Sequence, residues 1–315
     1  MKNIKKILLT ILILSVFTIY FIINYDDFLN LLSFNPLLIF ATSLVYSMTI
    51  IINGYALKLL ILPFNIKINL VESIKVSVIS TAGNFFTSSG GGMGLRAVYL
   101  KKKFSLAYTD YLSVLAGNYV LVFIVSSLIG ILSLLWLDVE KGTYFYIILI
   151  FFLALLLVGF IVIFLAMAEL ANGFIGYCKI KKLSAKFKIV KAGLRSIFKE
   201  PILVVRLIAV TLLNFLMSFL VTYLIIKMLD INLSLPSISL LTVLASLSLF
   251  INITPANLGV KEGVYIFTST VIGLDINKAL AIALVDRAIL FVVIGFLWLL
   301  VYKIFSRKTK NTLQI

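Results

Sequence analysis

The sequence contains no histidine and a single cysteine among its 315 residues. Histidine is the commonest general base and a frequent metal ligand, so its absence removes the side chain on which much hydrolytic and zinc chemistry depends. The one cysteine, Cys178, excludes an internal disulfide and a cysteine-based metal cluster. We therefore expect neither a metal ion nor a cofactor.

Charged residues are also scarce, at 13% of the chain, with 12 Asp and Glu against 28 Lys and Arg. Apolar residues make up 62%, and the mean hydropathy is +1.18. Soluble domains are about 45–50% apolar and about 25% charged, so the composition indicates a polytopic membrane protein. The net charge of +16 does not indicate nucleic-acid binding, because the basic residues cluster between apolar spans, as in cytoplasmic loops.

A helix needs about 20 apolar residues to cross a bilayer. We therefore predict an all-α integral membrane protein with about six full transmembrane helices, at residues 7–24, 37–57, 111–136, 143–167, 203–228 and 279–303. The first resembles a signal peptide, but no small-residue cleavage site follows, which favours a retained signal-anchor helix. Residues 1–315 form one polytopic domain, divided into a first half (1–170), a basic linker (171–202) and a second half (203–315).

Two further apolar stretches, 71–100 and 236–274, are interrupted by breaks. The first break contains Gly90, Gly91, Gly92 and Gly94, and the second contains Pro255, Asn257 and Gly259. Lipid cannot satisfy free backbone N–H and C=O groups, so a broken helix is stable only where protein or water surrounds it. Paired breaks in two halves of a membrane protein are typical of transport sites. We predict that both stretches form re-entrant helical hairpins.

The distribution of Lys and Arg predicts the orientation. The segments expected outside hold only Lys141, Lys227 and Lys278, and most other basic residues lie in segments expected inside. The positive-inside rule then places both termini in the cytoplasm, in a plasma-membrane protein. The first hairpin enters from the cytoplasm and the second from outside, so the two units are predicted to be inverted repeats. A shift of 165 residues aligns Gly94 with Gly259, Arg96 with Lys261, Asp110 with Asp275 and Ala116 with Ala281.

The linker between the halves alternates Lys with large apolar residues from 179 to 206. This pattern predicts an amphipathic helix on the inner leaflet in contact with anionic headgroups. An ordinary positive-inside loop that only fixes the topology is the alternative.

The second break has a defined local chemistry. Pro255 lacks an N–H and disfavours helical geometry at Thr254, so the incoming helix is predicted to end there. Asn257 and Gly259 tolerate left-handed backbone. Val260 then begins the returning helix, whose N-terminus favours a phosphate or carboxylate.

Four charged residues fall at membrane depth in the second half: Lys261, Glu262, Asp286 and Arg287. Adjacent helical residues point about 100° apart, so Asp286 and Arg287 need different partners. Glu262 is the natural partner of Arg287, which leaves Lys261 and Asp286 as a second pair. Ionisable residues inside a membrane are costly and usually functional, which makes all four candidate substrate-binding residues, although a purely structural network gives the same pattern.

Arg96 follows the first break and is the fifth candidate for substrate binding. Glycines before a basic residue at a helix start favour phosphate binding, although the chain has no Gly-Lys-Ser/Thr motif here. Arg96 serving only as a positive-inside anchor is the alternative. Tyr111 and Tyr119 lie near a predicted span end and are interpreted as interfacial belt residues without a site role.

At these residues the chain resembles the membrane domain of the lysylphosphatidylglycerol synthase family, also described as flippase-like. The second-half motif corresponds here to Pro255, Gly259-Val260-Lys261-Glu262, Gly273-Leu274-Asp275, the alanines of 279–283, and Arg287. In the first half Gly92, Arg96 and the basic run 101–103 match, but Met93 stands where the family carries Glu.

The resemblance implies handling of phospholipids or lipid-linked headgroups. Full-length synthases carry a separate soluble domain that makes the aminoacylated lipid, and the chain ends too soon after its last span for such a domain to be expected. Our leading interpretation is therefore a protein that binds and translocates an anionic phospholipid or lipid-linked headgroup rather than an enzyme. The alternatives are a lipid-modifying transferase, acting on phosphatidylglycerol or by glycosyl transfer, and an accessory partner of a separate synthase or glycosyltransferase.

Overall fold

The computed structural model describes residues 35–87, 91–139, 141–167, 181–251 and 254–312, and within these ranges the chain is helical without a β-strand. Five helices are long and apolar enough to cross a membrane. They are α3 (Pro36–Leu60), α6 (Tyr108–Leu135), α7 (Thr143–Met167), α10 (Pro201–Met228) and α13 (Ile276–Thr312). They confirm five of the predicted spans as helices. The sixth, 7–24, lies outside the described residues.

Each interrupted stretch is a pair of shorter helices. The first pair is α4 (Leu70–Phe86) and α5 (Gly91–Phe104), and the second is α11 (Leu235–Ser248) and α12 (Val260–Ile272). The longest of the four has 17 residues, which at about 1.5 Å per residue is shorter than the roughly 30 Å apolar core of a bilayer. The predicted helix–break–helix pattern is confirmed, whereas entry and exit of each pair on one membrane side stays a prediction.

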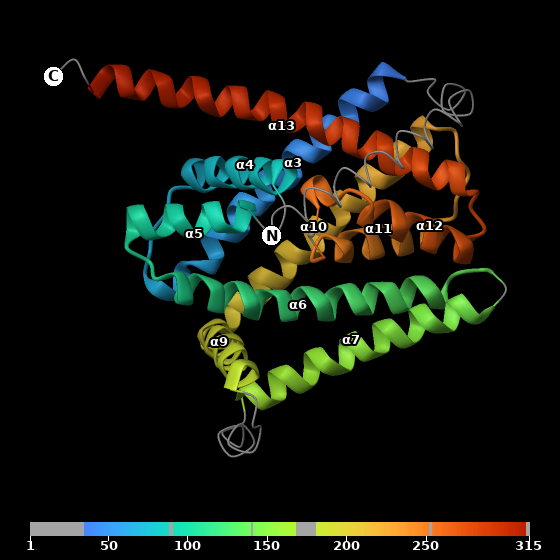
Figure 1. Ribbon diagram of the computed structural model, residues 1–315, viewed down its shortest axis with the longest axis horizontal. Coiled ribbons are helices and arrows are strands. Elements are labelled where there is room, and N and C mark those ends of the chain that lie inside the picture. The colour runs from blue at the N-terminus through green and yellow to red at the C-terminus, as the bar shows by residue number, and fades with distance from the viewer. Residues whose placement is uncertain (1–34, 88–90, 140, 168–180, 252–253, 313–315) are drawn as a thin grey trace, which may run out of the picture.

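The two hairpins face each other between the long helices α6 and α13 (Figure 1). The hairpin of α4 and α5 lies at one end of this layer, the hairpin of α11 and α12 lies at the other, and their tips point towards the middle. The short turn η2 (Pro255–Asn257), at the tip of the second hairpin, contacts α4 of the first. The second break therefore packs against the first hairpin near the centre of the molecule.

Corresponding helices in the two halves begin in the same way. Pro36 and Pro201, 165 residues apart, each open a long helix, where proline is well tolerated because the first N–H groups have no helical partner. At the same spacing, the side chains of Asn69 and Ser234 cap α4 and α11. The contacts correspond as well, because α3 packs on α10, while α4 contacts α13 and α11 contacts α6.

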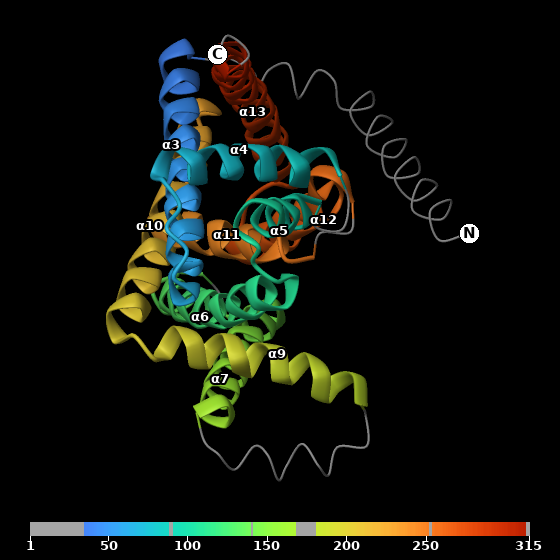
Figure 2. The same cartoon turned by 90° about the vertical axis from the view of Figure 1, so that its left-hand side faces the viewer.

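The basic linker contains helix α9 (Lys181–Phe198), which confirms the predicted helix. Its C-terminal part packs across α6, with Leu194 and Ile197 fully buried (Figure 2). The crossing is close because a Cβ added to Gly193 would lie 1.7 Å from the carbonyl oxygen of Ser113. Apolar residues that the sequence assigned to the lipid surface therefore pack on protein, and contact of the basic face with headgroups stays a prediction.

Candidate functional site

The second break is a left-handed turn followed by a new helix. Ala256, Asn257 and Gly259 have positive φ angles of 52°, 55° and 80°. Asparagine and glycine tolerate this region best, so the backbone predicted for Asn257 and Gly259 is confirmed. The returning helix α12 begins at Val260, also as predicted.

The incoming helix ends earlier than the sequence predicted. Helix α11 stops at Ser248, not at Thr254. The side-chain amide of Asn257 donates to the carbonyl oxygen of Ser248 at 3.0 Å and to its hydroxyl at 3.1 Å. A helix end leaves carbonyl groups without partners, and Asn257 satisfies one of them from across the turn. The proline therefore lies inside the turn instead of marking its start.

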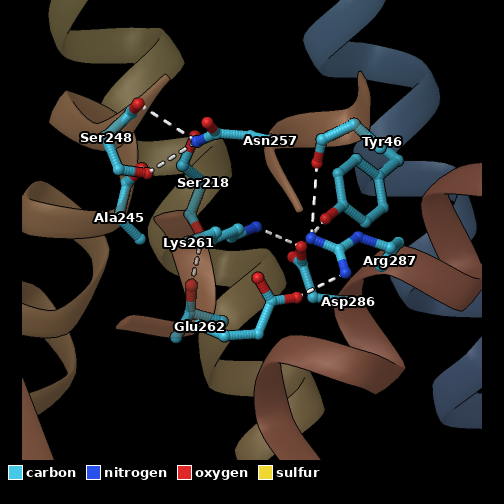
Figure 3. A network of polar contacts seen from close by, with 11 residues as sticks. Tyr46, Ser218, Ala245, Ser248, Asn257, Lys261, Glu262, Asp286 and Arg287 are labelled. Carbon is cyan, nitrogen blue, oxygen red and sulfur yellow. Dashed lines mark hydrogen bonds and ion pairs between the residues drawn. The ribbon is translucent and has the colours of Figure 1, made fainter. Parts of the chain in front are cut away.

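Four charges gather where α12 meets α13 (Figure 3). Lys261 forms an ion pair with Asp286, and Arg287 forms one with Glu262. The side chains of Glu262 and Asp286 are only 4% and 6% exposed. Both predicted pairings are confirmed, and the reason given for them holds, since the neighbours Asp286 and Arg287 turn to different partners.

Further contacts connect this charge cluster (Lys261, Glu262, Asp286 and Arg287) to the break and to the first half. The second oxygen of Glu262 accepts the backbone N–H of Gly259 at 2.8 Å. Arg287 donates to the carbonyl oxygen of Ala256 at 3.3 Å. From α3, the Tyr46 hydroxyl donates to Asp286. The cluster therefore ties the turn, α12 and α13 to a helix that lies more than 200 residues earlier in the chain.

The charge cluster is electrically balanced, with two cations and two carboxylates. Isolated charges are expensive to bury, and the cost falls only when each is paired and hydrogen-bonded. The side chains of Lys261 and Arg287 keep 17% and 16% of their surface exposed. A phosphate can replace a carboxylate as the partner of either cation. The oxygens of phosphate and of carboxylate both accept charge-assisted hydrogen bonds.

Three of the four glycines of the first break belong to a helix and not to a turn. Gly91, Gly92 and Gly94 belong to the start of α5, and Gly90 lies outside the described residues. A Cβ on Gly92 would lie 1.8 Å from the carbonyl oxygen of Ser80. The Gly92 N–H also donates to the side-chain oxygen of Asn84 at 2.9 Å. The absence of a side chain at position 92 thus allows α4 and α5 to approach closely.

This close approach brings Arg96 onto α4. Its Nε donates to the Ser80 hydroxyl at 2.6 Å, and Nη2 lies 3.5 Å from the Ser77 hydroxyl. Arg96 makes no hydrogen bond or ion pair with the charge cluster in the described part of the chain. The five candidate residues are thus divided between two places, Arg96 on the first hairpin and the other four where the second hairpin meets α13.

Two tyrosines of α6 do not belong to an interfacial belt. Tyr111 is only 1% exposed, and the Tyr119 hydroxyl donates to the sulfur of Met93 at 3.6 Å. They turn inwards because α6 packs on both α5 and α9. Tyr46 and Tyr111 are the site residues that the sequence did not indicate.

Residues 7–297 match the sequence profile of a family described as the lysylphosphatidylglycerol synthase TM region. A search of curated proteins gives no match to this chain.

Proposed function

The chain belongs to the lysylphosphatidylglycerol synthase transmembrane family, and from this premise we propose that it binds a phospholipid and moves its headgroup between the leaflets of the plasma membrane. Membership makes it a membrane protein related to lipid modification or transport. The observation that carries the transport proposal is the buried charge cluster beside a helix break in the apolar region. Such charges are costly within a membrane and mark the paths of substrates.

The cluster suggests how a headgroup crosses. A phosphate takes the place of Asp286 or Glu262 at one cation, and the released carboxylate then accepts hydrogen bonds from an ammonium or hydroxyl group of the same headgroup. An ammonium gives the released carboxylate a new counter-charge, and a hydroxyl gives it a hydrogen bond, so that neither leaves it without a partner. Because Lys261 belongs to the hairpin and Asp286 to α13, exchange at this pair loosens one element from the other.

We further propose that the two halves are inverted repeats. In transporters of this architecture the site lies where the repeats meet, and one repeat rocks against the other. Support comes from the equal spacing of the helix starts at Pro36 and Pro201 and of the caps at Asn69 and Ser234. The opposed hairpin tips in Figure 1 agree with it.

The orientation has a direct test by cysteine labelling. In a variant whose Cys178 is replaced by Ser, Gly142→Cys introduces an exposed thiol between α6 and α7, and Lys102→Cys introduces one at the end of α5. A membrane-impermeant maleimide should label position 142 in intact cells and position 102 only after permeabilisation, because basic segments face the cytoplasm. Labelling of position 102 in intact cells would contradict entry of the first hairpin from the cytoplasm.

An enzymatic role has less support. A transferase needs a base, and with no histidine in the chain the carboxylates that could serve are Glu262, Asp286 and Asp110. The first two are held in ion pairs with Arg287 and Lys261, so each must leave its cation before it can contact a substrate. A transferase would therefore need Asp110 as its base. Among the described residues Asp110 forms no ion pair, and its backbone carbonyl oxygen accepts a hydrogen bond from the Ser113 hydroxyl.

The proposed function is tested with purified protein in vesicles that contain fluorescent phosphatidylglycerol. Protein should expose inner-leaflet lipid to an external quencher, whereas protein-free vesicles and the variant Lys261→Gln/Asp286→Asn should quench only the outer leaflet. Mass analysis of the recovered lipid, with aminoacyl-tRNA present, distinguishes the alternatives. A modified lipid would indicate an enzyme, and unchanged lipid without translocation would favour an accessory role.

A further inference from the structure

We infer that Arg96 and the hydroxyls around it form a subsite for a singly charged phosphate diester, at the first hairpin and separate from the charge cluster of the second. The inference rests on the proposed function in that it takes a lipid headgroup as the source of the phosphate. It assigns the two hairpins different tasks, because their charges are arranged differently.

The first observation is a charge without a counter-charge. Lys261 and Arg287 each have a carboxylate partner, but no described ion pair involves Arg96, whose guanidinium contacts the neutral hydroxyls of Ser77 and Ser80. Arg96 is only partly exposed, and both serines are almost fully buried. A cation in such surroundings is stabilised by binding an anion.

The second observation is a buried hydroxyl beside this cation. Tyr111 is 1% exposed, and its hydroxyl has no hydrogen-bond partner among the described residues. The Arg96 guanidinium is the charged neighbour of this hydroxyl. Buried polar groups are nearly always paired, so an O–H without an acceptor next to a cation is suited to an anion that accepts from both.

The donor geometry favours phosphate. A guanidinium has five N–H donors in a planar fork that matches phosphate oxygens, and Ser80 and Ser77 account for two of those in Arg96. The amide oxygen of Asn84, one turn beyond Ser80 on α4, is already engaged, since it accepts the Gly92 N–H. The remaining arginine donors and the Tyr111 hydroxyl can therefore surround one phosphate group.

The charge balance selects a diester. One guanidinium neutralises one negative charge, whereas a doubly charged phosphate monoester would leave an unpaired charge. The helix start of the second hairpin offers no equivalent place, because Glu262 already accepts the Gly259 N–H there. Lys101, Lys102 and Lys103, exposed at the far end of α5, add a positive field that attracts anionic headgroups.

The test is equilibrium binding of radiolabelled phosphatidylglycerol to the purified protein in detergent micelles. Two competitors separate the sources: diacylglycerol has the same chains without phosphate, and glycerophosphoglycerol has the same phosphate diester without chains. Unlabelled phosphatidylglycerol should compete far better than either. Equal competition by diacylglycerol would overturn a phosphate subsite, and equal competition by glycerophosphoglycerol would overturn a lipid source.

Two pairs of variants locate the site. Arg96→Gln should weaken binding by about tenfold or more, because hydrogen bonds to charged groups contribute at least that factor, and Arg96→Lys should retain part of it. Met93→Glu places a carboxylate three residues before Arg96, on the same face of α5, and should weaken binding to a similar extent by neutralising the guanidinium. Met93→Gln is its neutral control. Unchanged affinity in Met93→Glu would overturn the inference, even if Arg96→Gln fails to fold.

The binding measurement also separates this inference from the proposed function. Arg96-dependent binding without translocation by the wild-type protein would retain the subsite and refute transport. Translocation that persists in Arg96→Gln, together with unchanged binding, would refute the subsite and retain transport.

Discussion

Replacing Glu262 with Gln is expected to lower the free energy of unfolding by about 3–5 kcal/mol, because it leaves the half-buried Arg287 without its carboxylate. The glutamine oxygen can still accept the Gly259 N–H, so the start of α12 keeps its cap and the effect reports the lost charge. Asp286 cannot replace Glu262 as the partner of Arg287, because it already pairs with Lys261 and accepts a hydrogen bond from Tyr46.

The double variant Glu262→Gln/Arg287→Gln should recover most of this stability, because removing both members of a buried pair is often nearly neutral. It should nevertheless fail to translocate phosphatidylglycerol if the cluster binds the headgroup. Unfolding in a denaturing detergent measures the first property, and the vesicle assay measures the second. Recovery of both folding and translocation would show that the pair is only structural.

A matched control is the exposed pair at the base of the first hairpin. Glu72 bonds to Lys103, and their side chains are 24% and 52% exposed. Exposed pairs contribute about 0–1 kcal/mol, so Glu72→Gln should change stability by less than about 1 kcal/mol. If Glu72→Gln and Glu262→Gln were equally mild, Glu262 would have to face water, and the packing of α12 on α13 would be wrong.

The pairing inside the charge cluster was predictable from the sequence because it depends on local geometry. Consecutive residues on a helix point in different directions, so Asp286 and Arg287 had to divide their partners, and few opposite charges were present at membrane depth. The hydrogen bond from Tyr46 to Asp286 was not predictable, since the two residues lie 240 positions apart. Such a contact depends on how α3 packs beside α13.

The ends of the helices also divide into those that the sequence predicts and those that depend on tertiary packing. Where a backbone property decides, the prediction is confirmed, as in the left-handed Asn257 and the start of α12 at Val260. Where a tertiary hydrogen bond sets the end of a helix, the prediction is wrong. Helix α11 ends at Ser248, whose carbonyl oxygen accepts a hydrogen bond from Asn257. The glycines of the first break are misleading for a related reason, because close helix packing and tight turns both require glycine.

Replacing Gly92 with Ala is expected to destabilise the protein by about 2–3 kcal/mol, within the range for overpacking plus a weakened hydrogen bond. The new Cβ would lie 1.8 Å from the Ser80 carbonyl oxygen and 2.6 Å from the Asn84 side-chain oxygen. A backbone carbonyl cannot rotate away as a flexible side chain does, so α5 must move from α4. This cost exceeds the gain of about 1 kcal/mol that alanine brings to a helix interior.

Gly94→Ala is the matched control, because it lies in the same turn of α5 and a Cβ there meets nothing within 4 Å. It should be neutral or stabilising by up to about 1 kcal/mol. Gly92→Ala should also weaken phosphatidylglycerol binding, because moving α5 takes Arg96 away from Ser80, whereas Gly94→Ala should bind as the wild type does. Equal stability of the two variants would refute the close contact between α4 and α5. A stable, binding-competent Gly92→Ala would show that Arg96 does not need α4 to hold its anion.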